Sequence, residues 1–171
     1  MTPDKAAFTR SPTRESFTGD VSRRVLETLQ TDHRQVRELL KTILSTADAK
    51  KRSDLFKQFR TELTAHSRAE EKVLYRGMAK SEEGKDDALE GAVEHEVVDR
   101  LMEEDLSRSR SIGSDKWTAR CTVLQELLEH HIDEEEGEFF KIARKIFDRE
   151  GLTKMGTAFT AERTKLASAI T

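Results

Sequence analysis

The sequence predicts an all-α protein, an antiparallel up-down-up-down four-helix bundle with a short extra C-terminal helix. Both prolines of the 171-residue chain, Pro3 and Pro12, lie in its first dozen residues, so long helices can form after them. Apolar residues recur at helical spacing through five segments, and short breaks between long helices favour antiparallel neighbours. We expect residues 20–171 to form one domain and residues 1–19 a disordered or loosely ordered polar tail.

The first two predicted helices carry clear apolar stripes. The first spans residues 20–46, and His33 falls inside its stripe. The second begins with Ser53 as its N-cap and ends near Gly77. The stripes consist of Val25, Leu26, Leu29, Val36, Leu39, Leu40, Ile43 and Leu44 in the first helix, and of Phe56, Phe59, Leu63, His66, Glu70, Val73 and Leu74 in the second.

The remaining segments predict two long helices and one short helix. Residues 86–110 form the third, with His95 beside an apolar face made of Leu89, Ala92, Val93, Val97, Val98, Leu101 and Met102. Ser114 caps the fourth helix, which Gly151 ends. A fifth helix, residues 153–168, is expected to pack on the outside of the bundle.

Composition excludes several classes of protein. A net charge of −3 gives no indication of a nucleic-acid or membrane partner. Apolar runs stay well short of the roughly 18 residues that a membrane span needs, and the N-terminus lacks a basic-then-apolar signal segment. A single cysteine, Cys121, excludes a disulfide framework within the chain, and we interpret it as core packing. We expect a soluble cytoplasmic protein, monomeric or homodimeric.

Two segments place a histidine and a glutamate four residues apart, His66-Ser-Arg-Ala-Glu70 and His131-Ile-Asp-Glu-Glu135. Residues at this spacing share one face of a helix, so each pair offers an imidazole and a carboxylate to the same point. One inward histidine comes from each of the other two long helices. The predicted metal ligands are therefore His33, His66, Glu70, His95, His131 and Glu135.

The two inward glutamates carry the chemical argument. A buried carboxylate without a partner is costly, and a bound cation compensates it while using the imidazole lone pairs. Mixed nitrogen and oxygen ligation by six residues suits two iron or manganese ions bridged by carboxylates better than one structural zinc. A lone inward histidine is more often a core residue, and a structural bundle without metal is the alternative. We interpret Glu71, Glu134 and Glu136 as solvated helix faces.

The ordered set His, His-x-x-x-Glu, His, His-x-x-x-Glu resembles hemerythrin-like proteins of the HHE cation-binding type, over about residues 22–147. The resemblance implies a four-helix bundle that holds two non-haem irons, bridged by oxygen and by the two carboxylates, with manganese or zinc as substitutes. Its small ligands would be O2, peroxide or NO. The resemblance supplies no separate catalytic residue.

The third helix departs from that pattern. Oxygen-carrying hemerythrins supply two histidines there, four residues apart, whereas Gly91 and Asp99 flank His95 at this spacing. His130, Glu94, Asp99 or water are alternatives for the missing ligand. We expect Gly91 to face the metals and to leave a gap beside one iron. An open position favours reaction with peroxide, NO or O2 over reversible oxygen carriage.

The principal functional hypothesis is a di-iron protein that binds or reduces oxygen species, with a stress-protective role and a catalase-like or peroxide-reducing activity left open. The alternative is a metal or oxygen sensor that acts on a partner through the N-terminal tail or the last helix, without turnover. His95-Glu96-Val97-Val98-Asp99 also resembles the zinc-protease helix, with Glu96 as base. That hypothesis leaves both inward glutamates unexplained.

Overall fold

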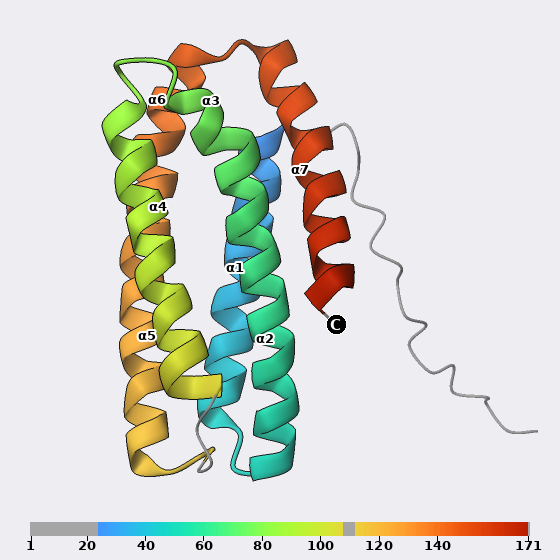
Figure 1. The fold of residues 1–171 in the computed structure, drawn as a ribbon, viewed down its shortest axis with the longest axis vertical. Coiled ribbons are helices and arrows are strands. Elements are labelled where there is room, and N and C mark those ends of the chain that lie inside the picture. The colour runs from blue at the N-terminus through green and yellow to red at the C-terminus, as the bar shows by residue number, and fades with distance from the viewer. Residues whose placement is uncertain (1–23, 108–111, 171) are drawn as a thin grey trace, which may run out of the picture.

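Four helical rods lie side by side, and a fifth helix packs against one side of them (Figure 1). The computed structural model describes residues 24–107 and 112–170, and this part of the chain contains no strand. The elements are α1 (Val25–Ser45), α2 (Ala49–Glu70), η1 (Glu71–Tyr75), α3 (Arg76–Met78), α4 (Lys85–Arg100), η2 (Leu101–Ser107), α5 (Asp115–Glu134), η3 (Glu135–Phe139), α6 (Phe140–Ile146) and α7 (Arg149–Ile170), where η denotes a π-helix. The predicted fold class is confirmed. The predicted tail lies outside the described residues.

Consecutive rods run in opposite directions (Figure 1). The second rod is α2 continued by η1 and α3, the third is α4 continued by η2, and the fourth is α5 continued by η3 and α6. α7 contacts α1 and α2, and lies on the side of the bundle away from α4 and α5 (Figure 1). None of the described helices combines the length and the hydrophobicity that crossing a membrane requires.

Two helix starts test the predicted caps. The Ser114 hydroxyl accepts a hydrogen bond from the Trp117 backbone N–H at 3.3 Å, as predicted. The prediction for Ser53 was wrong, because the N-cap of α2 lies five residues earlier, at Asp48, which accepts from the Lys51 N–H at 2.6 Å. Aspartate is at least as good an N-cap as serine, and the lysines and arginine that follow it are strong helix formers.

Gly151 does not end the fourth rod, which is a second correction. α6 ends at Ile146, and Phe147 is extended. The Gly151 N–H donates to the Asp148 carboxylate at 2.7 Å, so Gly151 belongs to the first turn of α7. Aspartate three residues before a glycine thus signals a helix start here, although glycine alone suggests a stop.

The apolar face predicted for the third rod was wrong in part. Val98 and Met102 are buried as predicted, but Leu89, Val93 and Val97 are 54%, 57% and 46% exposed. Ala88, Gly91 and His95 are buried in their place. Inward small residues leave room for neighbouring side chains, so the hydrophobic pattern by itself misjudged how this helix is rotated.

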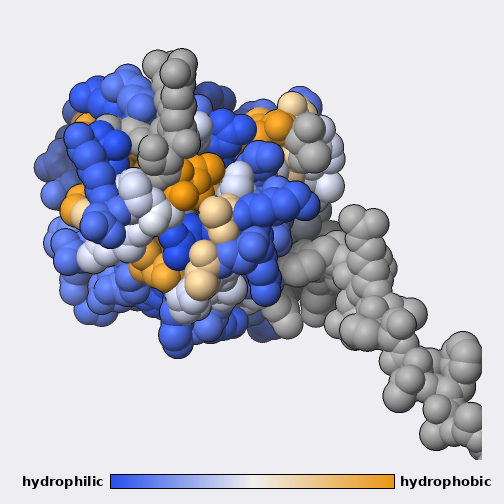
Figure 2. Space-filling view, turned by 90° about the horizontal axis from the view of Figure 1, so that it is seen from below, coloured by the Kyte–Doolittle hydropathy of each residue, from blue (hydrophilic) through white to orange (hydrophobic). Residues whose placement is uncertain are grey.

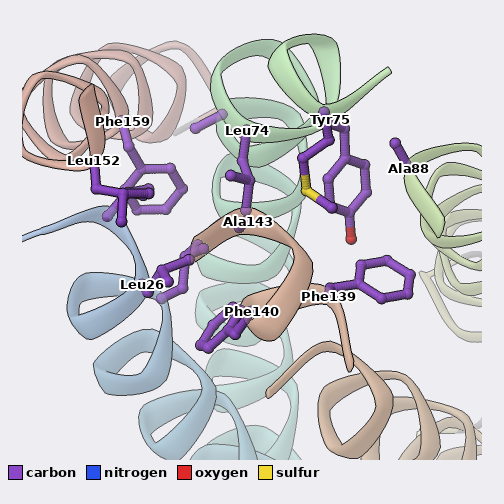
Figure 3. Packing of buried hydrophobic residues seen from close by; sticks show 13 residues of the cluster. Leu26, Leu74, Tyr75, Ala88, Phe139, Phe140, Ala143, Leu152 and Phe159 are labelled. Carbon is purple, nitrogen blue, oxygen red and sulfur yellow. The ribbon is translucent and has the colours of Figure 1, made fainter. Parts of the chain in front are cut away.

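The apolar core consists of two clusters separated by a polar layer. The upper cluster, drawn as sticks in Figure 3, contains Val25, Leu26, Leu29, Ala69, Leu74, Tyr75, Met78, Ala88, Phe139, Phe140, Ala143, Leu152 and Phe159. The lower cluster contains Val36, Leu40, Ile43, Phe56, Phe59, Leu63, Val98, Met102, Leu106, Trp117, Cys121, Leu124 and Leu128. The end of the bundle near the lower cluster is mostly hydrophilic on its surface, with small hydrophobic areas (Figure 2). All four inward histidines lie along their rods between members of the two clusters.

The cap of α2 supplies a first prediction. We expect Asp48→Ala to lower the free energy of unfolding by about 1 kcal/mol, because it removes the acceptor of the Lys51 N–H. Ser53→Ala is the matched control, and it should be neutral or slightly stabilising because residue 53 lies inside the helix. Urea unfolding of both variants is the measurement. A larger loss for Ser53→Ala would contradict the assigned cap.

Candidate metal centre

All six predicted ligands meet in the polar layer between the two apolar clusters. They come from four rods, with His33 on α1, His66 and Glu70 on α2, His95 on α4, and His131 and Glu135 at the junction of α5 and η3. None is more than 4% exposed. The structure therefore brings together every side chain that the inward spacing selected, while metal ligation itself stays a prediction.

The donor atoms form two groups that share Glu70. One group is His33, His66 and Glu70, the other is Glu70, His95 and His131, and within each group the donor atoms lie within 4.8 Å of one another. Glu135 Oε2 lies 3.2 Å from His33 Nε2 and 3.8 Å from His131 Nε2, so this carboxylate also reaches both groups. Each half thus offers two imidazoles and access to two shared carboxylates.

Several of these atoms have no hydrogen-bond partner among the described residues. They are His33 Nε2, both carboxylate oxygens of Glu70, and Glu135 Oε2. A buried polar atom without a partner costs about 1–3 kcal/mol, and more when it is charged. Four such atoms at one point are explained by a bound cation that accepts all their lone pairs. The residues present therefore fit a metal centre.

The four histidines present their Nε2 atoms to the centre because each Nδ1 is paired with a carboxylate from another rod. The Nδ1-to-oxygen distances are 2.8 Å for His33 and Glu136, 3.2 Å for His66 and Asp32, 3.0 Å for His95 and Glu71, and 2.6 Å for His131 and Glu94. A carboxylate that accepts a hydrogen bond from Nδ1–H fixes the tautomer and the ring orientation of a metal-binding histidine.

These four pairs close a ring around the bundle. Asp32 of α1 pairs with His66 of α2, and Glu71 of η1 pairs with His95 of α4. Glu94 of α4 pairs with His131 of α5, and Glu136 of η3 pairs with His33 of α1. Each carboxylate is also the sequence neighbour of a predicted ligand. The prediction that Glu71 and Glu136 are only solvated helix faces was therefore wrong, because each is partly exposed but also pairs with a histidine of the centre. Only Glu134, whose side chain is 42% exposed and pairs with His130, fits it.

The two central carboxylates have opposite acidities. Burial raises the pKa of Glu70 well above its ordinary value, and the neighbouring charge of Glu135 raises it further. Burial also acts to raise the pKa of Glu135, but the nearby imidazoles of His33 and His131 outweigh it and lower that pKa. Metal-free, the pair carries its charge mainly on Glu135, and a bound cation removes the conflict.

Tyr75 occupies the space where a gap was predicted. Gly91 is buried and faces the centre, as expected, but a Cβ at this position would lie 2.6 Å from the Tyr75 hydroxyl oxygen. That hydroxyl donates to Glu135 Oε1 at 2.8 Å, and the Tyr75 ring stacks on His95 with an interplanar angle of 13°. The missing histidine is thus replaced in space by a phenol from another rod, and the predicted gap is filled.

A π-helix explains why the sequence did not reveal Tyr75. Glu70 lies directly before the π-segment η1, and Glu135 is the first residue of the π-segment η3. In such a segment the repeat is i to i+5, so Tyr75 follows Glu70 on the same face, where the α-helical repeat would place Leu74. π-segments of this kind are frequent at functional sites, but their position is not apparent from residue type.

The other candidates for the missing ligand are engaged elsewhere. Asp99 pairs with Arg68, away from the centre, and Glu94 holds His131. His130 is 64% exposed. Glu96, the base of the protease hypothesis, is exposed, so it does not meet His95 and Asp99 at one point.

Cys121 lies in the lower cluster, as predicted from its place in the apolar stripe of the fourth helix. Burial raises the pKa of its thiol to about 12. The residue therefore acts as a small apolar side chain in the core.

An interior with four imidazoles and two carboxylates on facing helices is typical of helical bundles that bind metal ions. More specifically, the chain belongs to the hemerythrin HHE cation-binding domain family, whose model matches residues 24–143. The match covers the rods that carry all six candidate ligands, and it ends inside α6.

Two curated relatives are similar to the chain. A protein named DNA nickase from Nostoc sp. is 28% identical over 142 residues, which are 83% of this chain and 40% of the relative. An uncharacterised hemerythrin-like protein from Schizosaccharomyces pombe is 31% identical over 144 residues, which are 83% of this chain and 69% of the relative. The chain thus spans less than half the length of the first. No solved structure matches the chain.

The raised pKa of Glu70 gives a pH-dependent prediction for the metal-free protein. The folded state holds the Glu70 proton more tightly than the unfolded chain, so the associated stability is present below pH 4.5, the ordinary value, and is lost as the pH rises toward the folded-state pKa. At pH 7, metal-free Glu70→Gln should therefore unfold with a free energy about 1–3 kcal/mol above that of metal-free wild type. Urea unfolding with a chelator, at several pH values, measures it. A wild type that gains stability relative to the variant as the pH rises would show the opposite sign.

The space at Gly91 gives a second prediction. Gly91→Ala should lower the free energy of unfolding by about 1–3 kcal/mol, because its methyl group overlaps the Tyr75 phenol. Gly137→Ala is the control, because nothing lies within 4 Å of a Cβ added there, and it should be neutral or stabilising. Thermal unfolding compares the two. Equal melting temperatures would mean that the Tyr75 ring moves aside at little cost.

Proposed function

We propose that this protein binds two iron ions in the centre and reacts there with O2, peroxide or NO as part of a stress response. The observation that supports this most directly is the donor set, two histidines and shared carboxylates in each half, with unpartnered buried atoms pointing inward. Two histidines and a carboxylate with open positions are typical of non-haem iron(II). Bound iron would supply redox chemistry and the site for a small ligand.

The size of the internal space supports a small ligand. A cavity of about 10 Å³ is lined by all four histidines and by apolar side chains such as Val36, Leu63 and Leu128. This volume matches about one water molecule, so a molecule of two or three atoms suits it far better than an organic substrate. The apolar clusters above and below exclude bulk water from the centre.

Tyr75 supplies a proton-bearing group at the centre. Burial raises the pKa of its hydroxyl well above the ordinary value, and the nearby Glu135 and Glu70 charges raise it further. The hydroxyl therefore keeps its proton at neutral pH and donates it in a hydrogen bond to Glu135 Oε1, at 2.8 Å. In this position it orients Glu135 and can donate to an oxygen species held beside His95.

Two further expectations belong to this proposal. We place the protein in the cytoplasm, and we expect no nucleic-acid partner. The relative named DNA nickase gives that second expectation a direct check, namely incubation of the iron-loaded protein with supercoiled plasmid. The alternative function, a sensor without turnover, is favoured by one observation, the contact of α7 with His66 and its carboxylate partner.

Metal analysis tests the proposal. Protein produced with iron should hold about two irons per chain, and His66→Ala and His131→Ala should each lose metal from a different half. Removal of metal should lower the melting temperature, since metal binds the native state preferentially. Iron content by mass spectrometry and the optical spectrum after addition of peroxide, NO or azide are the measurements. Wild-type protein without bound iron, or a double variant that retains both ions, would exclude the proposal.

Tyr75→Phe separates the hydroxyl from the ring. The variant keeps the stacking on His95 but loses the donor to Glu135, so iron content should be unchanged. The affinity for azide or the rate of reaction with peroxide should change by about 10-fold, the scale of one hydrogen bond to a charged group. Azide titration and stopped-flow absorbance measure the two effects. Unchanged values for both would show that the hydroxyl does not take part.

A further inference from the structure

α7 lies outside the matched family domain, yet it reaches the metal centre. The family match ends at residue 143, and α7 begins at Arg149. The helix packs on α1 and α2, the rods that carry His33 and His66 (Figure 1). Its Phe159 ring is fully buried and meets the His66 ring edge-on, with centroids 5.7 Å apart.

Arg163 of α7 makes ion pairs with two carboxylates of the bundle. Its Nε atom lies 2.6 Å from Asp32 Oδ2, an ion-pair contact without hydrogen-bond geometry, and its Nη2 atom donates to Glu62 Oε2 at 2.7 Å. The same Asp32 oxygen lies 3.2 Å from His66 Nδ1. Asp32 therefore links Arg163 to His66, a candidate metal ligand.

Asp32 depends on the Arg163 charge because it is buried more deeply than the other three carboxylates of the ring. The Asp32 side chain is 3% exposed, whereas those of Glu71, Glu94 and Glu136 are 26%, 23% and 28% exposed. Water can solvate the other three carboxylates but hardly reaches Asp32. A carboxylate buried this deeply needs an opposite charge, and removal of that charge is strongly destabilising.

We propose that Arg163 is a positioning residue for the metal centre, which holds Asp32 against His66 and thereby couples the docking of α7 to metal occupancy of the His33–His66 half. The inference rests on the proposed function, since it requires metal. Coupling between two equilibria is reciprocal, so an α7 that strengthens metal binding must itself be held more firmly when metal is bound.

The C-terminal part of α7, after Phe159, is suited to a change in how firmly it is docked on the bundle. After Phe159 no residue of α7 up to Ile170 is fully buried. A groove of about 680 Å³ runs between this part of α7 and the α1 and α2 rods, and Asp32 and Arg163 lie on its wall. Helix segments with few buried apolar contacts open at low free-energy cost, so this one is held mainly by the Arg163 ion pairs together with the packing of the partly buried Leu166.

Metal titration and hydrogen exchange test the coupling on the full chain, with Co²⁺ as the probe. Arg163→Gln should bind one of two Co²⁺ ions about 10-fold more weakly, the scale expected for loss of support to a ligand histidine. In wild type, Co²⁺ should raise the protection of amides 160–170, and in Arg163→Gln this rise should disappear. Glu162→Gln is the matched control, because it removes the Lys72 ion pair of α7 at 2.8 Å without contact to Asp32, and it should behave as wild type in both measurements.

Arg163→Lys serves if the glutamine variant does not fold. It keeps the charge but cannot hold two carboxylates in fixed geometry, so its loss of affinity should be smaller and in the same direction. Wild-type affinity for both ions together with an undiminished rise in α7 protection, in the folded Arg163 variant, would overturn the inference and leave the proposed function intact. Wild type that binds no Co²⁺ or iron would overturn both.

Discussion

Two carboxylates placed in an apolar interior are the constraint on which the rest of this structure depends. Glu70 and Glu135 are fully buried between two hydrophobic clusters, and their charges oppose each other. Left alone, such a pair would favour a protonated or unfolded chain. A cation bound in the surrounding polar layer would compensate both carboxylates. The stability of the fold and the binding of metal therefore depend on the same residues.

The ring of carboxylates around the histidines follows from helix geometry. A residue next to an inward ligand points about 100° away from it, toward the adjacent rod. Asp32 and Glu94 precede a ligand histidine, whereas Glu71 and Glu136 follow a ligand glutamate, and each reaches the neighbouring rod. The eight acidic and imidazole groups of the ring all come from the four rods and none from a loop, which favours a centre held rigidly before metal binds.

The sequence predicted the fold class and the meeting of all six candidate ligands, because inward spacing on α-helices is periodic and these residues interrupt apolar stripes. It did not reveal Glu71 and Glu136 as partners, since a charged residue beside a stripe is ordinarily solvated. It also misplaced the start of α2 and the exposed face of α4, where tertiary packing of small residues decides the rotation. Tyr75 was inaccessible for a different reason, because a π-segment changes the repeat that all such arguments assume.

The same π-segment changes what the centre can do. Without it, Leu74 would face the polar layer, and the glycine at 91 would leave space beside His95. With it, the protonated Tyr75 phenol of the second rod fills the space beside Gly91 of the third rod, which lacks a second histidine, and donates a hydrogen bond to Glu135. Each half of the centre has two histidines, so two bound ions would have similar ligands. Under the proposed function, a centre with similar halves and a neighbouring proton donor would favour chemistry on a small oxygen species over its unchanged release, because a positioned proton donor accelerates reactions that need a proton.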